Sequence, residues 1–285
     1  MEFKNNDELK EALLLSETIQ ITTPDQFQLK QLTTPAKNKA KGIILYFHGG
    51  GLIFGQPDDL PKSYIDILTE DYIFISADYR LAPESKIDTI IQDALTQFDA
   101  VKANYPDMPI FVFGRSAGAF LSLMIASKRE VQGILDFYGY SRFHVPQFLR
   151  PNPQYKAMSA QITPQLLNQM IQSEPLTQGD LQTRYLIYLY ARGQNQWLDL
   201  LGIQQSSDAA YNIMPKTLKS FPPTFIVHGK QDPDVPFSEG QHLNRLIPDT
   251  TFIALDNNEH DFDREVSDFN LDIYQQAKSF LDQMV

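Results

Sequence analysis

The chain has 285 residues, of which 42% are hydrophobic and 12% aromatic, enough for one large domain with a sizeable core. Acidic residues outnumber basic ones by 35 to 24, which makes nucleic acid and anionic membranes poor partners, because both carry negative charge. There is no cysteine, so disulfides, thiolate metal sites and a cysteine nucleophile are excluded, and a reducing compartment fits.

The first residues, MEFKNNDELKEALLL, are charged and polar before a short apolar run. They lack the basic segment and long apolar stretch of a secretion signal. No stretch of the sequence approaches the roughly 20 apolar residues that span a bilayer. We therefore expect a cytoplasmic protein that neither crosses a membrane nor binds nucleic acid.

Short apolar runs alternate with helix-length amphipathic stretches along most of the chain. Residues 18–22 and 27–32 read as two strands joined by a turn at Pro24 and Asp25, which predicts a hairpin. Six further runs are nearly continuous in apolar residues, as expected for strands covered on both faces. They are Ile43–Phe47, Tyr72–Ser76, Ile110–Phe113, Ile134–Phe137, Thr224–Val227 and Thr251–Leu255.

Helical periodicity fills the gaps between these strands. The predicted helices are Pro61–Glu70, Thr89–Asn104, Ala117–Ser127, Ser238–Leu246 and Phe269–Met284. Strands that alternate with helices imply a mostly parallel sheet with helices on both faces.

The alternation breaks between about residues 140 and 218, a stretch rich in Gln, Tyr, Leu and Pro with no clear buried strand. Helices are predicted within it at Pro164–Gln172, Thr183–Ala191 and Asn195–Leu201. We therefore expect a core made of residues 1–139 and 219–285. The inserted segment, residues 140–218, is expected to form a helical cap over one edge of the sheet.

The sharpest local signal is Gly114-Arg115-Ser116-Ala117-Gly118, which lies between a predicted strand and a predicted helix. In that context G-x-S-x-G predicts a nucleophile elbow, a sharp turn that lifts the serine oxygen clear of the sheet. Glycines on both sides let the strand and helix backbones pass closely. The helix start then presents N–H groups toward developing negative charge. Ser116 is the predicted nucleophile.

A second motif, His48-Gly49-Gly50-Gly51, directly follows the first buried strand. Consecutive glycines let the backbone expose N–H groups to a ligand. Beside a nucleophile elbow, an HGGG loop supplies part of the oxyanion hole, and the residue after the serine supplies another N–H. The predicted donors are the main-chain N–H groups of Gly50, Gly51 and Ala117. His48 is expected to hold the loop rather than to transfer a proton.

A serine nucleophile needs a general base. In folds with a G-x-S-x-G nucleophile elbow, this histidine follows both the serine and the acid in the chain. Among the histidines that follow the inserted segment, His228 ends a predicted strand and His242 lies in a predicted helix. His260 instead follows the last strand and precedes the last helix. His260 is therefore the predicted base.

The base in turn needs a carboxylate that orients its ring. Asp232 lies on the loop after the strand Thr224–Val227, from which it can reach the neighbouring loop. Asp232 is the predicted acid, with Asp234 as the second choice. Asp256 would need an unusual fold-back, because it is only four residues before His260.

Together these motifs resemble the hormone-sensitive-lipase-like branch of the α/β-hydrolases. HGGG at 48–51, DYRLAPE at 78–84, G-x-S-x-G at 114–118 and the loops of Asp232 and His260 follow the order of that family. The resemblance covers about 43–139 and 222–283. It implies an α/β-hydrolase fold with an eight-stranded, mostly parallel sheet, a helical cap over an acyl pocket, and carboxylesterase activity. The chain is also similar to uncharacterised α/β-hydrolases of Gram-positive bacteria.

Two positions depart from the family's usual G-D-S-A-G-G, where this chain has Arg115 and Ala119. Arg115 inverts the charge beside the serine. It could favour an anionic substrate, but we expect an ion pair with the cap. Tyr185 and Tyr188 could line a substrate pocket, although their helical spacing with Leu181 favours a core face.

The expected reaction is hydrolysis of a small-molecule carboxylic ester, short-chain or small aromatic, through an acyl-enzyme on Ser116. No metal or organic cofactor is expected, and no HExxH or similar compact ligand set occurs. One alternative is a prolyl-oligopeptidase-type peptidase, for whose substrate amino terminus the inserted segment offers little beyond Glu174. Another is a non-enzymatic ligand-binding protein on a hydrolase scaffold. A homodimer could form through an edge strand or a face of the cap.

Overall fold

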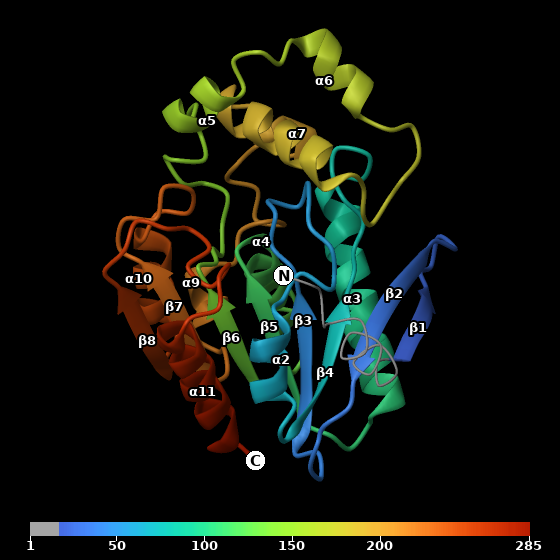
Figure 1. Ribbon diagram of the computed structural model, residues 1–285, viewed down its shortest axis with the longest axis vertical. Helices are drawn as coiled ribbons and strands as arrows, with labels where there is room; N and C mark the ends of the chain where they lie inside the picture. The colour runs from blue at the N-terminus through green and yellow to red at the C-terminus, as the bar shows by residue number, and fades with distance from the viewer. Residues whose placement is uncertain (1–16) are drawn as a thin grey trace, which may run out of the picture.

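The protein folds around a single mixed sheet of eight strands, seen in a computed structural model that describes residues 17–285 (Figure 1). The first residues, for which we expect no secretion signal, lie outside the described residues. The strand order is β1-β2-β4-β3-β5-β6-β7-β8. The strands are β1 (Glu17–Thr22), β2 (Gln28–Thr34), β3 (Gly42–Phe47), β4 (Tyr72–Ala77), β5 (Ile110–Arg115), β6 (Gly133–Phe137), β7 (Thr224–Gly229) and β8 (Thr250–Leu255).

Strand pairing confirms the predicted hairpin and the mostly parallel sheet. β1 pairs antiparallel with β2, and β2 pairs antiparallel with β4. Every pair from β4 through β3 and β5 to β8 is parallel. In such a sheet all the loops that leave the carboxyl ends of the parallel strands meet at one edge, which is where α/β proteins place their sites.

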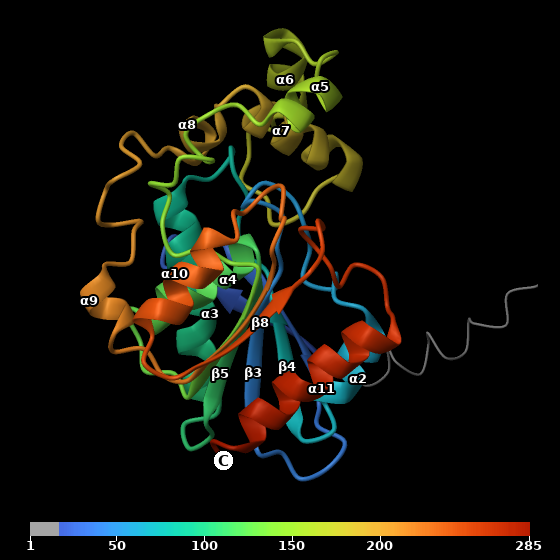
Figure 2. The ribbon, with the colours of Figure 1, turned by 90° about the vertical axis from the view of Figure 1, so that its left-hand side faces the viewer.

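Helices cover both faces of the sheet, as the alternating pattern predicts. They are α2 (Lys62–Leu68), α3 (Ile87–Asn104), α4 (Ala117–Ala126), α10 (Ser238–Leu246) and α11 (Asp268–Asp282). α2 and α11 lie together on one face, and α3, α4 and α10 lie on the other (Figures 1 and 2).

The central strand β3 shows how one sequence serves both faces. Ile43, Leu45 and Phe47 belong to the buried apolar cluster on the side of α3 and α4. Ile44 and Tyr46 belong to a second cluster, on the side of α2 and α11. Successive side chains of a strand point to opposite faces, so a strand buried on both sides has to be apolar throughout.

The chain between β6 and β7 contains helices and, within the described residues, no strand. Its helices are α5 (Pro153–Met158), α6 (Pro164–Met170), α7 (Leu181–Gly193), α8 (Trp197–Leu201) and α9 (Pro215–Leu218). The three predicted helices are confirmed as α6, α7 and α8, whereas the short helices α5 and α9 were not predicted. Figure 1 shows α5, α6 and α7 above the edge at which the parallel strands end. Among the helices of residues 17–285, none has the length and apolar character to cross a membrane.

Candidate active site

The turn between β5 and α4 places Ser116 in a strained backbone conformation. Its φ is 53° and its ψ is −116°, a combination that non-glycine residues rarely adopt. The Ser116 N–H donates to the carbonyl of Phe137 at 2.8 Å, which ties the turn to β6. A side chain at Gly118 would collide with the carbonyl of Phe47, so the glycine lets α4 start against β3. The predicted nucleophile elbow is therefore present as a turn.

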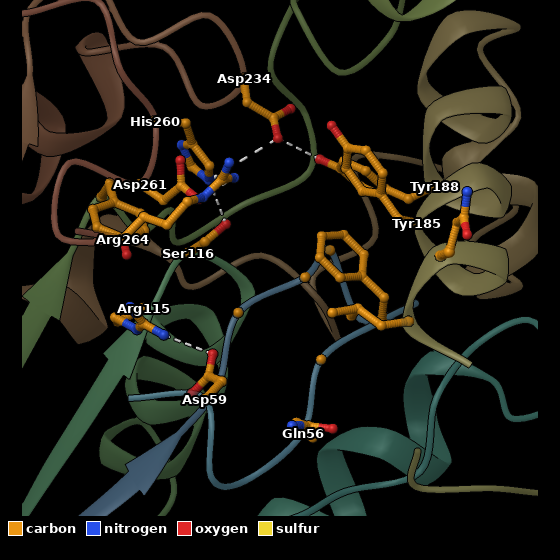
Figure 3. Close-up of a pocket in the computed structure, with 18 of the residues that line it drawn as sticks. Gln56, Asp59, Arg115, Ser116, Tyr185, Tyr188, Asp234, His260, Asp261 and Arg264 are labelled. Atoms are coloured by element: carbon orange, nitrogen blue, oxygen red, sulfur yellow. Dashed lines mark hydrogen bonds and ion pairs between the residues drawn. The ribbon is translucent and has the colours of Figure 1, made fainter. Parts of the chain in front are cut away.

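Three loops at the same edge of the sheet bring Ser116, His260 and Asp232 into a hydrogen-bonded chain. His260 Nε2 lies 2.9 Å from Ser116 Oγ (Figure 3), and His260 Nδ1 lies 2.7 Å from Asp232 Oδ2. The other oxygen of Asp232 accepts the N–H groups of Asp234 and Val235 at 2.8 and 2.9 Å. The acid is thus fixed by its own turn, and the ring of His260 is fixed by the acid.

The charges around His260 favour its protonated form. Burial opposes the positive charge, but Asp232, helped by Asp234 and Asp261, raises the pKa of His260 to about 9. Burial likewise opposes ionisation of Asp232, yet His260 and His228 hold the pKa of Asp232 well below its usual value. The pair therefore tends to carry opposite charges, which suits a base that becomes an imidazolium during the reaction.

His228 is a neighbour of the acid whose position the sequence did not reveal. Its side chain is fully buried, and its Nε2 lies 3.0 Å from the carbonyl of Val235 and 3.4 Å from Asp232 Oδ2. It was expected only to end a strand. The observed ring contacts the turn of residues 232–235, the acid turn, at both of its ends.

The HGGG loop has its carbonyl groups occupied and its N–H groups available. His48 Nδ1 and the Tyr79 hydroxyl lie 2.8 and 3.1 Å from the carbonyl oxygen of Gly49, and the indole of Trp197 donates to the carbonyl of Gly51 at 2.9 Å. Gly50 and Gly51 have φ of 97° and 61°, which glycine adopts at little cost. The His48 ring stacks on Tyr79 at 4.3 Å, as expected for a residue that holds the loop.

A cavity of about 1000 Å³ opens beside Ser116 and His260. Gly50 and Gly51 line it, together with Phe54, Tyr155, Tyr185 and Tyr188. Leu181 is 55% exposed, whereas Tyr188 belongs to the buried apolar cluster and Tyr185 packs against it, so the expected core face on α7 is confirmed for the two tyrosines but not for Leu181. Tyr185 and Tyr188 also present their rings to the cavity (Figure 3). The helical spacing identified the right helix face, and that face serves both as core and as cavity wall.

Arg115 does not contact the inserted segment, so the expected ion pair with the cap was wrong. Its guanidinium lies 2.6 Å from Asp59 and 3.4 Å from Asp263, and its Nε donates to the Tyr46 hydroxyl at 2.8 Å. Arg115 is only 7% exposed, although it reaches the cavity wall. Two carboxylates already compensate its charge, which removes the main reason to expect an anionic substrate.

Asp263, three residues after His260, is the second anchor of this network. It accepts the hydroxyls of Tyr138 and Tyr274 at 2.7 and 2.6 Å. Tyr138 in turn packs edge-on against the His260 ring at a centroid distance of 4.9 Å. Arg115 therefore links the elbow to the loop of the predicted base, through partners that no local motif signals.

Asp234, the second choice for the acid, does not bind His260 Nδ1, which faces Asp232 instead. Its carboxylate is held by two side chains of α7. Tyr188 donates to its Oδ2 at 2.6 Å (Figure 3), and Arg192 donates to its Oδ1 at 2.9 Å. The Oδ2 atom lies 4.0 Å from His260 Nε2. Asp256 is 82% exposed at its side chain and lies 3.7 Å from Lys230, so it takes no part in the site.

The other end of α7 is joined to the DYRLAPE segment. Arg184 donates to both oxygens of Glu84 at 2.7 and 2.9 Å, and also to the carbonyl groups of Ile53 and Ala82. Both side chains are almost fully buried. Asp180 caps the start of this helix by accepting the Thr183 N–H at 2.8 Å. The DYRLAPE segment thus serves to dock the inserted segment.

Two further sequence expectations concern ligands. Glu174, which the peptidase alternative would use, is exposed and does not line the cavity. Within residues 17–285 no group of three or more His, Asp or Glu side chains is arranged to hold a metal ion.

Comparisons with known proteins agree with this fold. A family model described as alpha/beta hydrolase fold matches residues 44–263. A Staphylococcus aureus protein with unknown function superposes with a TM-score of 0.92 at 43% identity, over 94% of this chain and 99% of that one. An alpha/beta hydrolase superfamily protein from Enterococcus faecalis gives 0.78 at 26% identity, with the same coverage. A probable carboxylesterase, M8, from Phoma sp. is 22% identical over 79% of this chain and 80% of its own length.

Proposed function

Since the chain belongs to the alpha/beta hydrolase fold family and is a carboxylesterase-like hydrolase, we propose that it cleaves small carboxylic esters through Ser116, His260 and Asp232. The observation that carries the proposal is the hydrogen-bonded chain of these three side chains beside an N–H-rich loop. That combination of nucleophile, base, orienting acid and oxyanion donors is what acyl transfer requires.

In the proposed first step, Ser116 Oγ attacks the ester carbonyl while His260 Nε2 takes its proton. Asp232 keeps the imidazole in the tautomer that can accept this proton and stabilises the imidazolium that forms. The N–H groups of Gly50, Gly51 and Ala117 stabilise the oxyanion. His260 then gives the proton to the leaving alcohol, and water releases the acid from the acyl-enzyme.

The proposed substrates are short-chain or small aromatic esters. Tyr188 supports this size limit, because its ring packs so closely on Gly51 that a side chain at that glycine would collide with it. Phe54 packs against Tyr185 and Tyr188 at centroid distances of 5.4 Å. These rings narrow the cavity next to the oxyanion loop and favour a small apolar acyl group.

The experiment that tests the proposal compares Ser116→Ala with a matched control, Ser122→Ala. Ser122 is another buried serine, six residues further along and on α4. Ser116→Ala is expected to lower hydrolysis of p-nitrophenyl acetate by a factor on the order of 10⁶ and to abolish labelling by a fluorophosphonate. Ser122→Ala should retain both. Hydrolysis that survives in Ser116→Ala would exclude the proposed nucleophile.

A panel of p-nitrophenyl esters of increasing acyl length, assayed beside aminoacyl-p-nitroanilides, tests the substrate class. We expect activity to fall as the acyl chain lengthens, and no cleavage of the anilides. We further propose a cytoplasmic location, which the absence of cysteine supports. A homodimer stays a prediction.

A further inference from the structure

Asp234 is a buried carboxylate at the reaction centre that the proposed triad does not use. It is 5% exposed, it lines the cavity, and it lies on α7's side of the acid turn. Its Oδ1 receives two hydrogen bonds from Arg192, at 2.9 and 3.2 Å. Its Oδ2 receives the Tyr188 hydroxyl at 2.6 Å.

The Oδ2 atom has capacity for another donor, and the nearest reacting atom is His260 Nε2 at 4.0 Å. That distance is too long for a direct hydrogen bond. It suits one bridging water, whose oxygen would lie about 2.8 Å from each acceptor with an angle of roughly 90° between them. In the acyl-enzyme Ser116 Oγ is esterified, so His260 Nε2 is then available to such a water.

We propose that Asp234 is a further catalytic residue that binds the water which hydrolyses the acyl-enzyme, an inference that rests on the proposed esterase function. The water oxygen forms a bond to the acyl carbon, and the bond from that carbon to Ser116 Oγ breaks. One water proton passes to His260 Nε2 and then to Ser116 Oγ. The other stays on the oxygen of the released acid, and Asp234 keeps its charge throughout.

The surroundings of Asp234 keep it an acceptor. Arg192 is buried beside it and balances its charge. Burial, together with the Asp234 charge, raises the pKa of both Tyr155 and Tyr188, so their hydroxyls stay protonated at neutral pH. The two protonated tyrosine hydroxyls cannot take a proton from the bound water. The Asp234 carboxylate is therefore held in place as a hydrogen-bond acceptor.

This arrangement selects water over alcohols as the second substrate. Water can donate to His260 and to Asp234 at once, whereas an alcohol has one O–H and cannot add a hydrogen bond to Asp234 Oδ2 beside the one from Tyr188. The alcohol therefore forms one hydrogen bond fewer at a buried carboxylate, which costs free energy. The wild-type acyl-enzyme is therefore expected to favour hydrolysis over transfer of the acyl group to an added alcohol.

The test is Asp234→Asn, which keeps the shape of the side chain. The amide oxygen is expected to face Arg192, which can only donate, so the amide NH₂ replaces Oδ2 next to His260. We expect deacylation of p-nitrophenyl acetate to slow by roughly 10-fold to 100-fold, while acylation, read from kcat/KM on its high-pH plateau and from fluorophosphonate labelling, changes less than about threefold. Stopped flow should then show a p-nitrophenol burst, and added methanol should capture a larger share of the acyl group.

One control separates water binding from loss of a charge near His260. Asp261→Asn removes another carboxylate charge that raises the pKa of His260. Asp261 pairs with Arg264 and is not proposed to bind the water. This variant should keep the wild-type ratio of methanolysis to hydrolysis. An equal loss of acylation and deacylation in Asp234→Asn, or an unchanged ratio, would overturn the role of Asp234 alone. A wild-type protein that neither hydrolyses the ester nor labels would overturn the esterase proposal as well.

Discussion

Helix α7 is held down by two buried arginines that are alike in chemistry and different in what they join. Arg184 pairs with Glu84 of the DYRLAPE segment, which belongs to the scaffold around the oxyanion loop. Arg192 pairs with Asp234, two residues after Asp232 in the acid turn. One contact fixes the helix, and the other also fixes part of the site.

This difference shows that one short turn, residues 232–235, both supplies the predicted acid and binds the inserted segment through Asp234. Asp232 Oδ1 accepts the N–H groups of Asp234 and Val235, so the side chain of Asp232 and the backbone of Asp234 move together. Any shift of α7 at its Arg192 end therefore reaches His260 through Asp232. A shift of α7 at its Arg184 end acts on Glu84 and the DYRLAPE segment, not directly on Ser116, His260 or Asp232.

The largest effect is expected from breaking the contact nearer the chemistry, with Arg192→Met. Removing one partner of a buried ion pair leaves an uncompensated charge and costs about 3–5 kcal/mol of the free energy of unfolding. Because the acid turn then loses its hold, kcat/KM should also fall, by about 10-fold or more. Urea unfolding and ester kinetics on the folded protein measure the two losses. Wild-type kinetics in this variant would show that the turn does not depend on α7.

Arg184→Met is the matched break at the other end of the helix. The free energy of unfolding should again fall by about 3–5 kcal/mol, because Glu84 is left buried without its partner. Ester kinetics of the folded protein should stay within about threefold of the wild type. A loss of kcat/KM as large as in Arg192→Met would erase the distinction between the two contacts.

The smallest effect expected is a shift in pH dependence. Only neutral His260 can accept the serine proton, so kcat/KM should rise with pH and level off above about 9. Asp234→Asn should move this limb to lower pH, since Asp234 raises the pKa of His260. Glu84→Gln, at the scaffold contact, should leave the limb in place. Profiles of kcat/KM against pH for the three proteins decide this.

The raised pKa of His260 also affects stability, and there the effect of rising pH is a loss rather than a gain. The pKa of His260 in the folded protein, about 9, lies above its ordinary value of 6.5. The stabilisation from the charged pair with Asp232 is therefore complete below about pH 6.5 and is lost as the pH rises through about 9. Thermal unfolding of the wild type, compared with His260→Gln across this pH range, should show the two converging at high pH.

The sequence predicted the parts of this molecule that depend on local patterns. The strands, the elbow at Ser116 and the order of the acid and base loops follow from periodicity and short motifs, and the parallel sheet brings strand-end loops together. The partners of Arg115 could not be predicted, because Asp59 and Asp263 are distant in sequence and nothing local directs them to it. The two contacts of α7 were missed for the same reason.

The indole of Trp197 limits how the inserted segment can be exchanged. It comes from α8 and donates to the carbonyl of Gly51, 146 positions earlier in the chain. A chimaera that borrowed this segment from a relative would have to bring a hydrogen-bond donor to the same point in space, or leave that buried carbonyl unpaired. Recombination libraries built across β6 and β7 should therefore enrich for a donor side chain at position 197, even when the rest of the transplanted segment is free to vary.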